Sequence, residues 1–302
     1  MTESKAGTVR ANGVRFATLE AGDGPLVLCL HGFPDHARSF RHQLPALAAA
    51  GFRAVAPYMR GYAPTEIPAD GRYQTAVLAV DAIELIGALG YSSAHIFGHD
   101  WGAIAAYGAA IRAPEKVIKL VTAAVPHGPS VLSAFLQSYD QQRRSWYMFF
   151  FQTPFADAAV AHDDFHFIER LWQDWSPGWA YPAEEMEALK VTFRSPGVLQ
   201  AALGYYRQTL NPANQDPALA KLQTTISMSP VAAPTLVFHG ARDGCMGVEL
   251  LDGMEALFPN GLHKAVIRDA GHFVHQEKPE EVNQLLIDFL RTSEAEYDAC
   301  VS

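Results

Sequence analysis

The chain has 302 residues, about twice the size of a typical domain, which suits one large α/β domain or a core with an insertion. Apolar residues make up 49% of the chain and charged residues 18%, so a disordered chain and a coiled coil are both excluded. The net charge of −9 argues against a nucleic-acid partner bound through a basic face, and no apolar run approaches the roughly 18 residues of a membrane span.

The beginning of the chain and its cysteines both indicate the cytoplasm. The opening residues, MTESKAGTVRANG, lack the apolar stretch of a secretory signal peptide. Cys29, Cys245 and Cys300 form an odd set without metal-ligand spacing, and Cys29 is expected to be a small buried apolar residue in the run LVLCL. We therefore expect a cytoplasmic enzyme without a disulfide framework.

Strand and helix patterns alternate over the first part of the chain. A β-hairpin is expected at Asn12-Gly13, a dipeptide favoured in type I′ turns. Beyond it we expect a strand over 26–31, a helix around 39–50, a strand over 52–58, a helix over 75–89, a strand over 94–99, a helix ending near 112 and a strand over 117–125. This alternation predicts a mainly parallel, twisted sheet flanked by helices on both faces.

The alternation stops between about 127 and 230, where aromatic-rich helical segments take over. Four of the five tryptophans lie there, and most are expected to pack within the segment: Trp146, Trp172, Trp175 and Trp179. The alternating pattern then resumes with strands over 234–240 and 263–269 and helices around 247–257 and from about 279. We therefore predict a core formed by residues 1–127 and 230–302, with a helical cap over 128–229 inserted between two sheet strands.

The segment Gly98-His99-Asp100-Trp101-Gly102 lies between an expected strand and an expected helix. It has the form of a nucleophile elbow with aspartate at its centre. Flanking glycines suit a sharp turn that lifts the central side chain above the sheet, at a helix N-terminus. A carboxylate held there can attack an electrophilic carbon and form an ester. Taken alone, the pattern also fits Asp100 as a plain helix N-cap.

Two later loops supply candidates for an acid and a base. Asp243 follows the strand in FHGARD, and His272 lies in DAGHFVHQEKPEEV before the last helix. A histidine can take a proton from water, and a buried carboxylate can orient its ring. The order Asp100, Asp243, His272 is that of the α/β-hydrolases, so we predict a hydrolytic triad.

Other motifs suggest how the site is completed. HGFPD, residues 31–35, follows a strand, and the N–H groups of Phe33 and Trp101 are expected to form an oxyanion hole, although an ordinary turn also fits. The side chain of His99 is expected to point away from the pocket, and His275 to be a structural or rim residue. No histidine cluster has metal-ligand spacing, so no metal is expected.

Together these motifs resemble those of epoxide hydrolases of the α/β-hydrolase fold. HGFPD, MRGYAPTE at 59–66, GHDWG, the Asp243 loop and GHFVHQEKPEEV match that family in place and order, across nearly the whole core. The insertion resembles the family's helical cap more loosely, and haloalkane dehalogenases share GHDWG. The resemblance implies no cofactor, a small hydrophobic epoxide as substrate, substrate binding by Pro34 and Trp101, and a monomer or homodimer.

The resemblance also implies two cap tyrosines that activate the epoxide oxygen. WYMFFFQTP places the first at Tyr147, and the pattern aromatic, tyrosine, arginine in GYYRQ selects Tyr206 as the second. Two phenol donors can hydrogen-bond and protonate the alkoxide that forms when an epoxide opens. Each tyrosine also fits a simple packing role. Tyr205 stands where many relatives have tryptophan, and the segment 155–200 matches poorly, so no substrate size is implied.

Several other functions fit the same residues less well. A haloalkane dehalogenase would use the same triad, but Phe33 stands where many carry asparagine, so Trp146 or Trp172 would have to supply the second halide donor. Trp101 argues against a fluoroacetate dehalogenase, which favours arginine there, and Asp100 argues against ester or lactone hydrolases, which use serine. A non-catalytic ligand receptor on this fold often lacks a triad or oxyanion element, whereas this sequence has them all.

Overall fold

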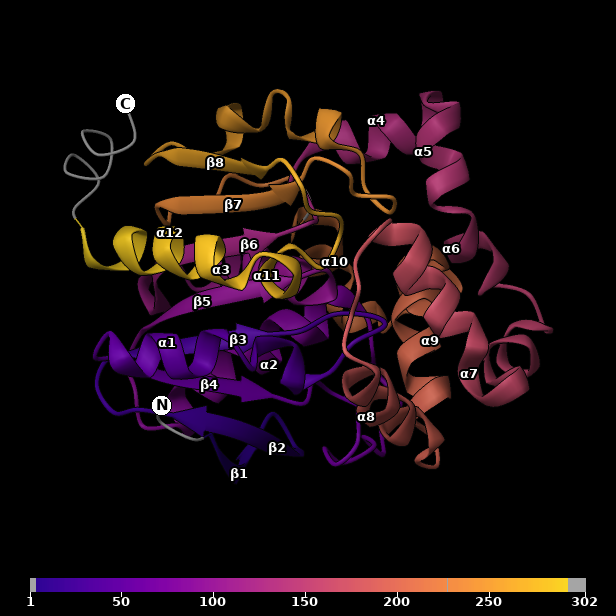
Figure 1. The fold of residues 1–302 in the computed structure, drawn as a ribbon, viewed down its shortest axis with the longest axis horizontal. Coiled ribbons are helices and arrows are strands. Elements are labelled where there is room, and N and C mark those ends of the chain that lie inside the picture. Colours follow the sequence, from indigo (N-terminus) through magenta and orange to yellow (C-terminus); the bar gives the residue numbers. More distant parts are fainter. Residues whose placement is uncertain (1–3, 227, 293–302) are drawn as a thin grey trace.

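A single sheet of eight strands forms the centre of the molecule (Figure 1). The computed structural model describes residues 4–226 and 228–292, so Cys300 and the end of the expected second core part lie outside it. The strand order is β1-β2-β4-β3-β5-β6-β7-β8; β2 is antiparallel to both its neighbours, and all other neighbouring strands are parallel, which confirms the predicted sheet type. The strands are β1 (Lys5–Ala11), β2 (Val14–Ala21), β3 (Leu26–Leu30), β4 (Arg53–Pro57), β5 (Ala94–His99), β6 (Val117–Ala123), β7 (Thr235–Gly240) and β8 (Leu262–Ile267).

The hairpin between β1 and β2 forms where it was predicted. Asn12 and Gly13 both have positive φ, 43° and 76°, as a type I′ turn requires at its two central residues. Ala11 pairs with Val14 directly across this turn. The turn therefore sets the register of the antiparallel edge of the sheet.

The central strand β3 explains why the sheet is buried on both faces. All five of its residues are apolar, as is usual for a parallel strand covered on both sides. Because successive side chains point to opposite faces, Leu26, Leu28 and Leu30 join one core cluster. Val27 and Cys29 join the other, and Cys29 is completely buried, as predicted.

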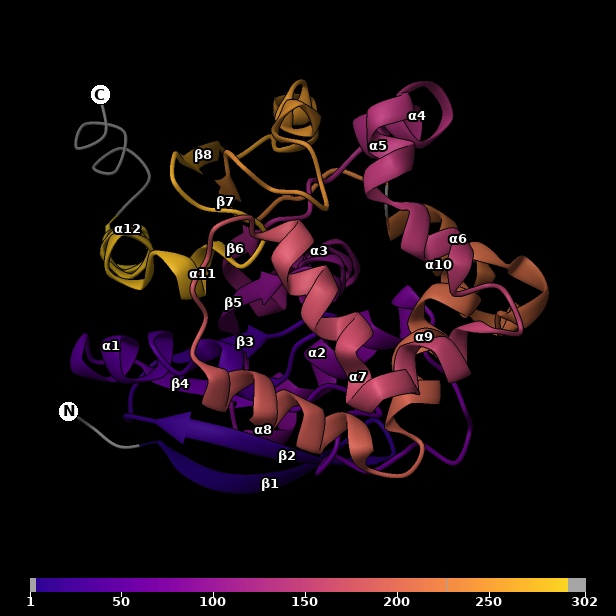
Figure 2. The same ribbon diagram turned by 45° about the vertical axis from the view of Figure 1, so that its right-hand side comes forward.

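Helices cover both faces of the sheet, as the alternating pattern predicts. α1, α11 and α12 lie on one face, and α2 and α3 lie on the other (Figures 1 and 2). α12 has Pro279 at its first position, glutamates in its first turn and Arg291 in its last, an order that the helix dipole favours. The core helices are α1 (Gln43–Ala49), α2 (Thr75–Ala88), α3 (Trp101–Arg112), α11 (Val274–Glu277) and α12 (Pro279–Arg291).

Between β6 and β7 the described residues contain helices and no strand, and we call the helices α4–α10 the insertion. Its helices α6–α9 lie beyond the carboxyl ends of the parallel strands, whereas α10 packs against α2 and α3 (Figure 2). Within the described part of the chain, no helix combines the length and apolar character needed to cross a bilayer. The insertion contains α4 (Pro129–Gln137), α5 (Tyr139–Arg144), α6 (Trp146–Phe150), α7 (Ala156–Trp175), α8 (Ala183–Arg194), α9 (Val198–Leu210) and α10 (Ala220–Ile226). α7 is divided by a kink at residues 162–165, three of which have positive φ.

The prediction of a helix around residues 247–257 is wrong. Two 3₁₀ helices, Val248–Leu251 and Met254–Leu257, occupy this segment. Gly253 between them has a φ of 77°, in the left-handed region, which an α-helix cannot contain. The helix expected around 39–50 is also divided, because a 3₁₀ helix over Ala37–Phe40 precedes α1.

Candidate active site

Asp100 lies on a sharp turn between β5 and α3, at the carboxyl end of the strand. Its backbone has φ 52° and ψ −118°, a strained conformation that persists only where the surroundings enforce it. A Cβ atom on Gly32 would overlap the Asp100 side chain, and a Cβ atom on Gly102 would overlap the carbonyl oxygen of Leu30. The crowded turn therefore holds a carboxylate that is only 5% exposed at the N-terminus of a helix.

Replacing Gly102 with alanine should destabilise the protein, because the new methyl group would collide with the backbone of β3. We expect the free energy of unfolding to fall by about 1–3 kcal/mol, the usual cost of overpacking a core. The matched control is Gly87→Ala in α2, where a Cβ atom meets open space and alanine should add up to about 1 kcal/mol. Urea unfolding followed by tryptophan fluorescence measures both variants. Equal stability of Gly102→Ala and the wild type would contradict the inferred crowding.

The two oxygen atoms of the Asp100 carboxylate have different partners. Oδ1 accepts the backbone N–H of Phe33 at 2.7 Å. Oδ2 lies 3.7 Å from Nε2 of His272. Trp101 begins α3, and the first amide of a helix has no partner within the helix. The two amides expected to form an oxyanion hole thus come from the loop after β3 and from the start of α3.

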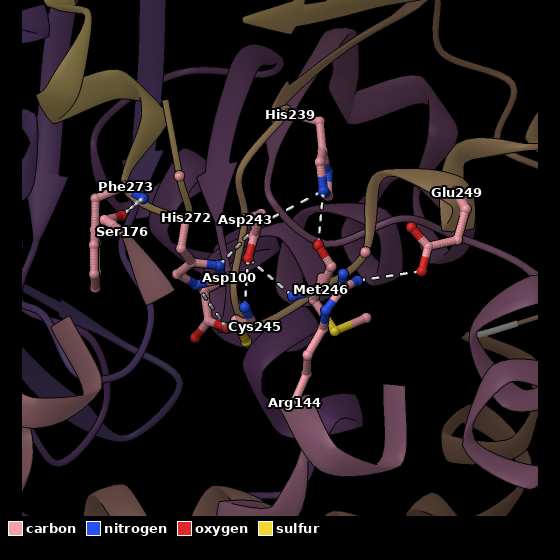
Figure 3. A network of polar contacts seen from close by, with 12 residues as sticks. Asp100, Arg144, Ser176, His239, Asp243, Cys245, Met246, Glu249, His272 and Phe273 are labelled. Carbon is pink, nitrogen blue, oxygen red and sulfur yellow. Dashed lines mark hydrogen bonds and ion pairs between the residues drawn. The ribbon is translucent and has the colours of Figure 1, made fainter. Parts of the chain in front are cut away.

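His272 and Asp243 form a buried pair beside Asp100 (Figure 3). His272 Nδ1 lies 3.0 Å from Asp243 Oδ2, while Asp243 Oδ1 accepts the backbone N–H groups of Cys245 and Met246 at 2.7 and 2.9 Å. Burial would lower the pKa of His272, but the Asp243 carboxylate, Cys245 and the nearby Asp100 together raise this pKa well above its usual value. Burial would raise the pKa of Asp243, and the imidazole nevertheless lowers it. Asp243 is therefore ionised, and its carboxylate orients the imidazole ring of His272.

Tyr147 and Tyr206 are brought together from two helices of the insertion, α6 and α9. Their ring centroids are 5.7 Å apart, and both side chains are almost completely buried. Burial raises the pKa of each phenol well above 10, so both hydroxyls remain protonated donors. The hydroxyl of Tyr206 makes no hydrogen bond to any described residue. The hydroxyl of Tyr205, in contrast, donates to the carbonyl of Arg60 at 2.8 Å.

The remaining residues singled out from the sequence lie close to this site. The indole N–H of Trp172 donates to the carbonyl of Pro34 at 2.8 Å, so this donor is already occupied. Trp146 is 46% exposed. His99 is buried with its Nε2 3.0 Å from the carbonyl of His272, and burial lowers the pKa of His99 to about 3. His275 is also fully buried, with Nε2 3.3 Å from Ser39 Oγ, so it is a structural residue and does not lie at a rim.

Two residues that the sequence did not single out for the site lie within it. Cys245 Sγ is 3.3 Å from the hydroxyl of Tyr147. Trp175 places its ring 4.8 Å from that of Tyr147 and 5.0 Å from that of His272. Its backbone carbonyl accepts the N–H groups of both Gly244 and His272, at 3.0 and 3.1 Å. The position of Cys245 two residues after Asp243 was a usable signal, whereas a contact made by a backbone carbonyl leaves no trace in the sequence.

Comparison with known proteins shows the family to which the chain belongs. Residues 25–279 match the family model described as the alpha/beta hydrolase fold. The chain is 31% identical to human "Epoxide hydrolase 4" over 293 residues, which cover 94% of this chain and 77% of the relative. It is also 31% identical to "Epoxide hydrolase" from Caballeronia sordidicola over 310 residues, covering 95% and 94% of the two chains.

A solved structure agrees with these relatives. It is a variant of an epoxide hydrolase from Bacillus megaterium, complexed with its product, a naphthyloxy-propane-1,2-diol. The TM-score is 0.83 at 30% sequence identity, and the match covers 95% of this chain and all of the other. The chain therefore belongs to the α/β-hydrolase fold family and, within that family, to the epoxide hydrolases.

Proposed function

We propose that this protein hydrolyses an epoxide to a vicinal diol through a covalent ester on Asp100. The observation that carries the proposal is the two-sided environment of the Asp100 carboxylate, with the Phe33 amide on Oδ1 and His272 Nε2 facing Oδ2. The names of the relatives support the same reaction, and the product of the Bacillus megaterium enzyme is a vicinal diol.

In the first step, Asp100 Oδ2 attacks one epoxide carbon, and the bond between that carbon and the ring oxygen breaks. Tyr147 and Tyr206, held in the insertion as a cap over the sheet, hydrogen-bond the departing oxygen, and one of them gives it a proton. Both phenols are suited to this role because burial keeps their pKa values well above 10. The product is a hydroxyalkyl ester whose carbonyl oxygen is Oδ1, already bound by the Phe33 N–H.

In the second step, His272 takes a proton from a water molecule, which attacks the carbonyl carbon of the ester. The N–H groups of Phe33 and Trp101 stabilise the negative charge on Oδ1. The bond between the carbonyl carbon and the diol oxygen then breaks, and the proton held by His272 passes to that oxygen, so the diol leaves. The second proton of the water, which remains on the Asp100 carboxyl, returns to the tyrosine that gave up its proton in the first step. Formation of the ester removes the charge of Asp100, one of the groups that raise the pKa of His272. The imidazole consequently becomes a free base more readily at the stage when it must activate water.

The substrate that fits this site is apolar and uncharged. The Phe33 ring lies edge-on to the rings of Phe151, Phe193 and Tyr206, with centroids 5.4, 6.1 and 5.3 Å away. These rings form an aromatic wall beside the amide that binds Asp100. We propose that Pro34 and Trp101 line the same pocket, so that a small hydrophobic epoxide is bound largely by apolar contact.

A single turnover in H₂¹⁸O tests the covalent step. With enzyme in excess over epoxide, we expect the first ¹⁸O atom to enter the carboxylate of Asp100, and the diol to carry unlabelled oxygen. Mass spectrometry of the peptide that contains Asp100, alongside the diol, measures both. Label that appears in the diol during the first turnover would show direct attack by water and overturn the ester mechanism.

The reaction class is tested on two substrate panels, one of small epoxides and one of haloalkanes, with Asp100→Ala as the blank. We expect diol release without halide release. Halide release without diol formation would replace the proposal with dehalogenation. The indole N–H of Trp172 is bonded to the carbonyl of Pro34, so it is not free to hold a halide, which favours the epoxide.

A further inference from the structure

The loop that carries His272 is bonded through its backbone on both sides of this residue. The N–H of Gly271 donates to the carboxylate of Glu277, with its two oxygens at 3.0 and 2.9 Å. The N–H of Phe273 donates to the hydroxyl oxygen of Ser176 at 3.2 Å (Figure 3). The residues immediately before and after the base are therefore each held by a polar side chain.

A hydrogen bond connects these two side chains to each other. Ser176 Oγ donates its proton to Glu277 Oε1 at 2.6 Å while it accepts the N–H of Phe273. Ser176 is the first residue after α7 and is 1% exposed, whereas Glu277 is the last residue of α11. A Cβ atom on Gly271 would lie 2.5 Å from Cα of Ser176, so glycine is needed for this close approach. The insertion and the core thus meet in one network at the loop of the base.

Glu277 is a partly buried carboxylate that takes part in this network and in no salt bridge. Burial raises the pKa of Glu277, and the Ser176 hydroxyl and the Gly271 N–H act in the opposite direction. Within the part of the chain that the structure describes, no lysine or arginine forms an ion pair with Glu277. Its polar contacts therefore serve the loop of the base.

The position of this loop matters because Asp243 fixes the direction of the imidazole but not the place of the backbone that carries it. Nδ1 of His272 lies 3.0 Å from Asp243 Oδ2, and Nε2 lies 3.7 Å from Asp100 Oδ2. Only χ1 and χ2 connect the backbone of a histidine to its ring, so a shift of the loop moves Nε2 by a similar distance. The water that attacks the ester must lie between Nε2 and the carbonyl carbon, and such a shift would displace it.

We propose that Ser176 and Glu277 are positioning residues for the base, which together hold its loop so that His272 Nε2 faces the ester on Asp100. The inference rests on the proposed function, because it assigns both residues to the second chemical step. The attack of Asp100 on the epoxide does not use the base. Loss of either positioning residue should therefore slow hydrolysis of the ester and leave its formation unchanged.

Transient kinetics separates these two steps. Enzyme in excess is mixed with an epoxide and quenched with acid, and intact-protein mass spectrometry follows the ester. In Ser176→Ala and Glu277→Ala we expect ester hydrolysis to slow by about 10- to 100-fold, since misplacing a catalytic group by about 1 Å costs up to that much, while the ester forms at the wild-type rate. Glu277→Gln keeps one acceptor oxygen and should recover part of the rate lost in Glu277→Ala. Equal slowing of both steps, or unchanged ester hydrolysis in both alanine variants, overturns the inference.

Gln43→Ala is the matched control for damage to α11. Gln43 is completely buried, and its amide donates to the carbonyl of His275, in the same helix as Glu277, at 2.9 Å. Its loss should lower the free energy of unfolding and leave the rates of both steps as they are. Ester hydrolysis as slow in Gln43→Ala as in Glu277→Ala would show that any disturbance of this helix has the same effect, and would contradict a specific role for Glu277.

Amide hydrogen exchange measured by NMR tests the hold on the loop without turnover. We expect faster exchange at Gly271 in Glu277→Ala and at Phe273 in Ser176→Ala, whereas Gln43→Ala should leave both amides protected. Unchanged exchange at both amides would show that the two side chains do not hold the loop. Should Glu277→Ala fail to fold, Ser176→Ala and Glu277→Gln carry both tests. If exchange changes as expected but the wild type forms no ester with any epoxide, the hold on the loop stands and the proposed function fails instead.

Discussion

Replacing His272 with glutamine should stop turnover after the first chemical step and leave the substrate attached to Asp100. Glutamine preserves much of the packing in this buried position but cannot accept a proton from water. The attack by Asp100 does not need that base, so the ester should form and accumulate. We expect kcat to fall by about 10²–10⁴-fold or more, the usual contribution of a general base. Intact-protein mass spectrometry should show an added mass equal to that of the whole epoxide.

The neighbouring His275 provides the control for this accumulation of the ester. His275 is as fully buried as His272 but contacts Ser39 and lies outside the reaction. His275→Gln should lower stability without accumulating an ester. An added mass in His275→Gln, or none in His272→Gln under conditions where the wild type forms diol, would contradict the assignment of the base. With a haloalkane as substrate, an added mass smaller than that of the whole molecule, together with release of halide, would indicate a dehalogenase.

Replacing both Tyr147 and Tyr206 with phenylalanine should block the first step and leave the second intact. Without phenol donors, the departing oxygen must leave as an unprotonated alkoxide in a buried, apolar site. We expect kcat/KM for epoxides to fall by about 10²–10⁴-fold, and each single variant to lose less. Stopped-flow mixing followed by acid quench measures ester formation directly. Because burial raises the pKa of both phenols, wild-type activity should show no loss from tyrosine ionisation up to about pH 10.

Tyr205→Phe is the matched control, since this tyrosine adjoins Tyr206 and is equally buried. Its hydroxyl donates to the carbonyl of Arg60, so its removal should lower the free energy of unfolding by about 1 kcal/mol. Ester formation should proceed at the wild-type rate. A fall in kcat/KM for Tyr205→Phe as large as that for Tyr206→Phe would mean that the second donor has been assigned to the wrong tyrosine.

The catalytic candidates were predictable because each lies in a local pattern. Asp100 is flanked by the glycines of its turn, Asp243 follows the buried strand β7, and His272 lies in the loop between β8 and the last helices. The order of these strands in the sheet then brings the three residues together without further information. Tyr206 needed the resemblance to a known family, because nothing local separates it from Tyr205. The structure distinguishes them by their hydroxyl partners.

Where prediction failed, the cause was a contact or backbone angle that composition does not reveal. The segment 247–257 has the apolar spacing of a helix, but Gly253 adopts a left-handed conformation and divides it. Cys245 has its neighbours in the site only because two distant loops converge there. Such contacts depend on the finished sheet, which no short stretch of sequence contains.

The end of α7 connects the insertion to the loops that hold Asp243 and His272 through one atom. The carbonyl oxygen of Trp175 accepts the backbone N–H groups of His272 and of Gly244, the residue that follows Asp243. A substitution at position 175 does not by itself remove these bonds, because every amino acid carries the same backbone carbonyl. Only a shift of the backbone can break them. Exchanging insertions between relatives to change substrate range should therefore succeed when the junction preserves the length of α7. A graft one residue too long or too short would disturb both loops, even if every catalytic side chain were retained.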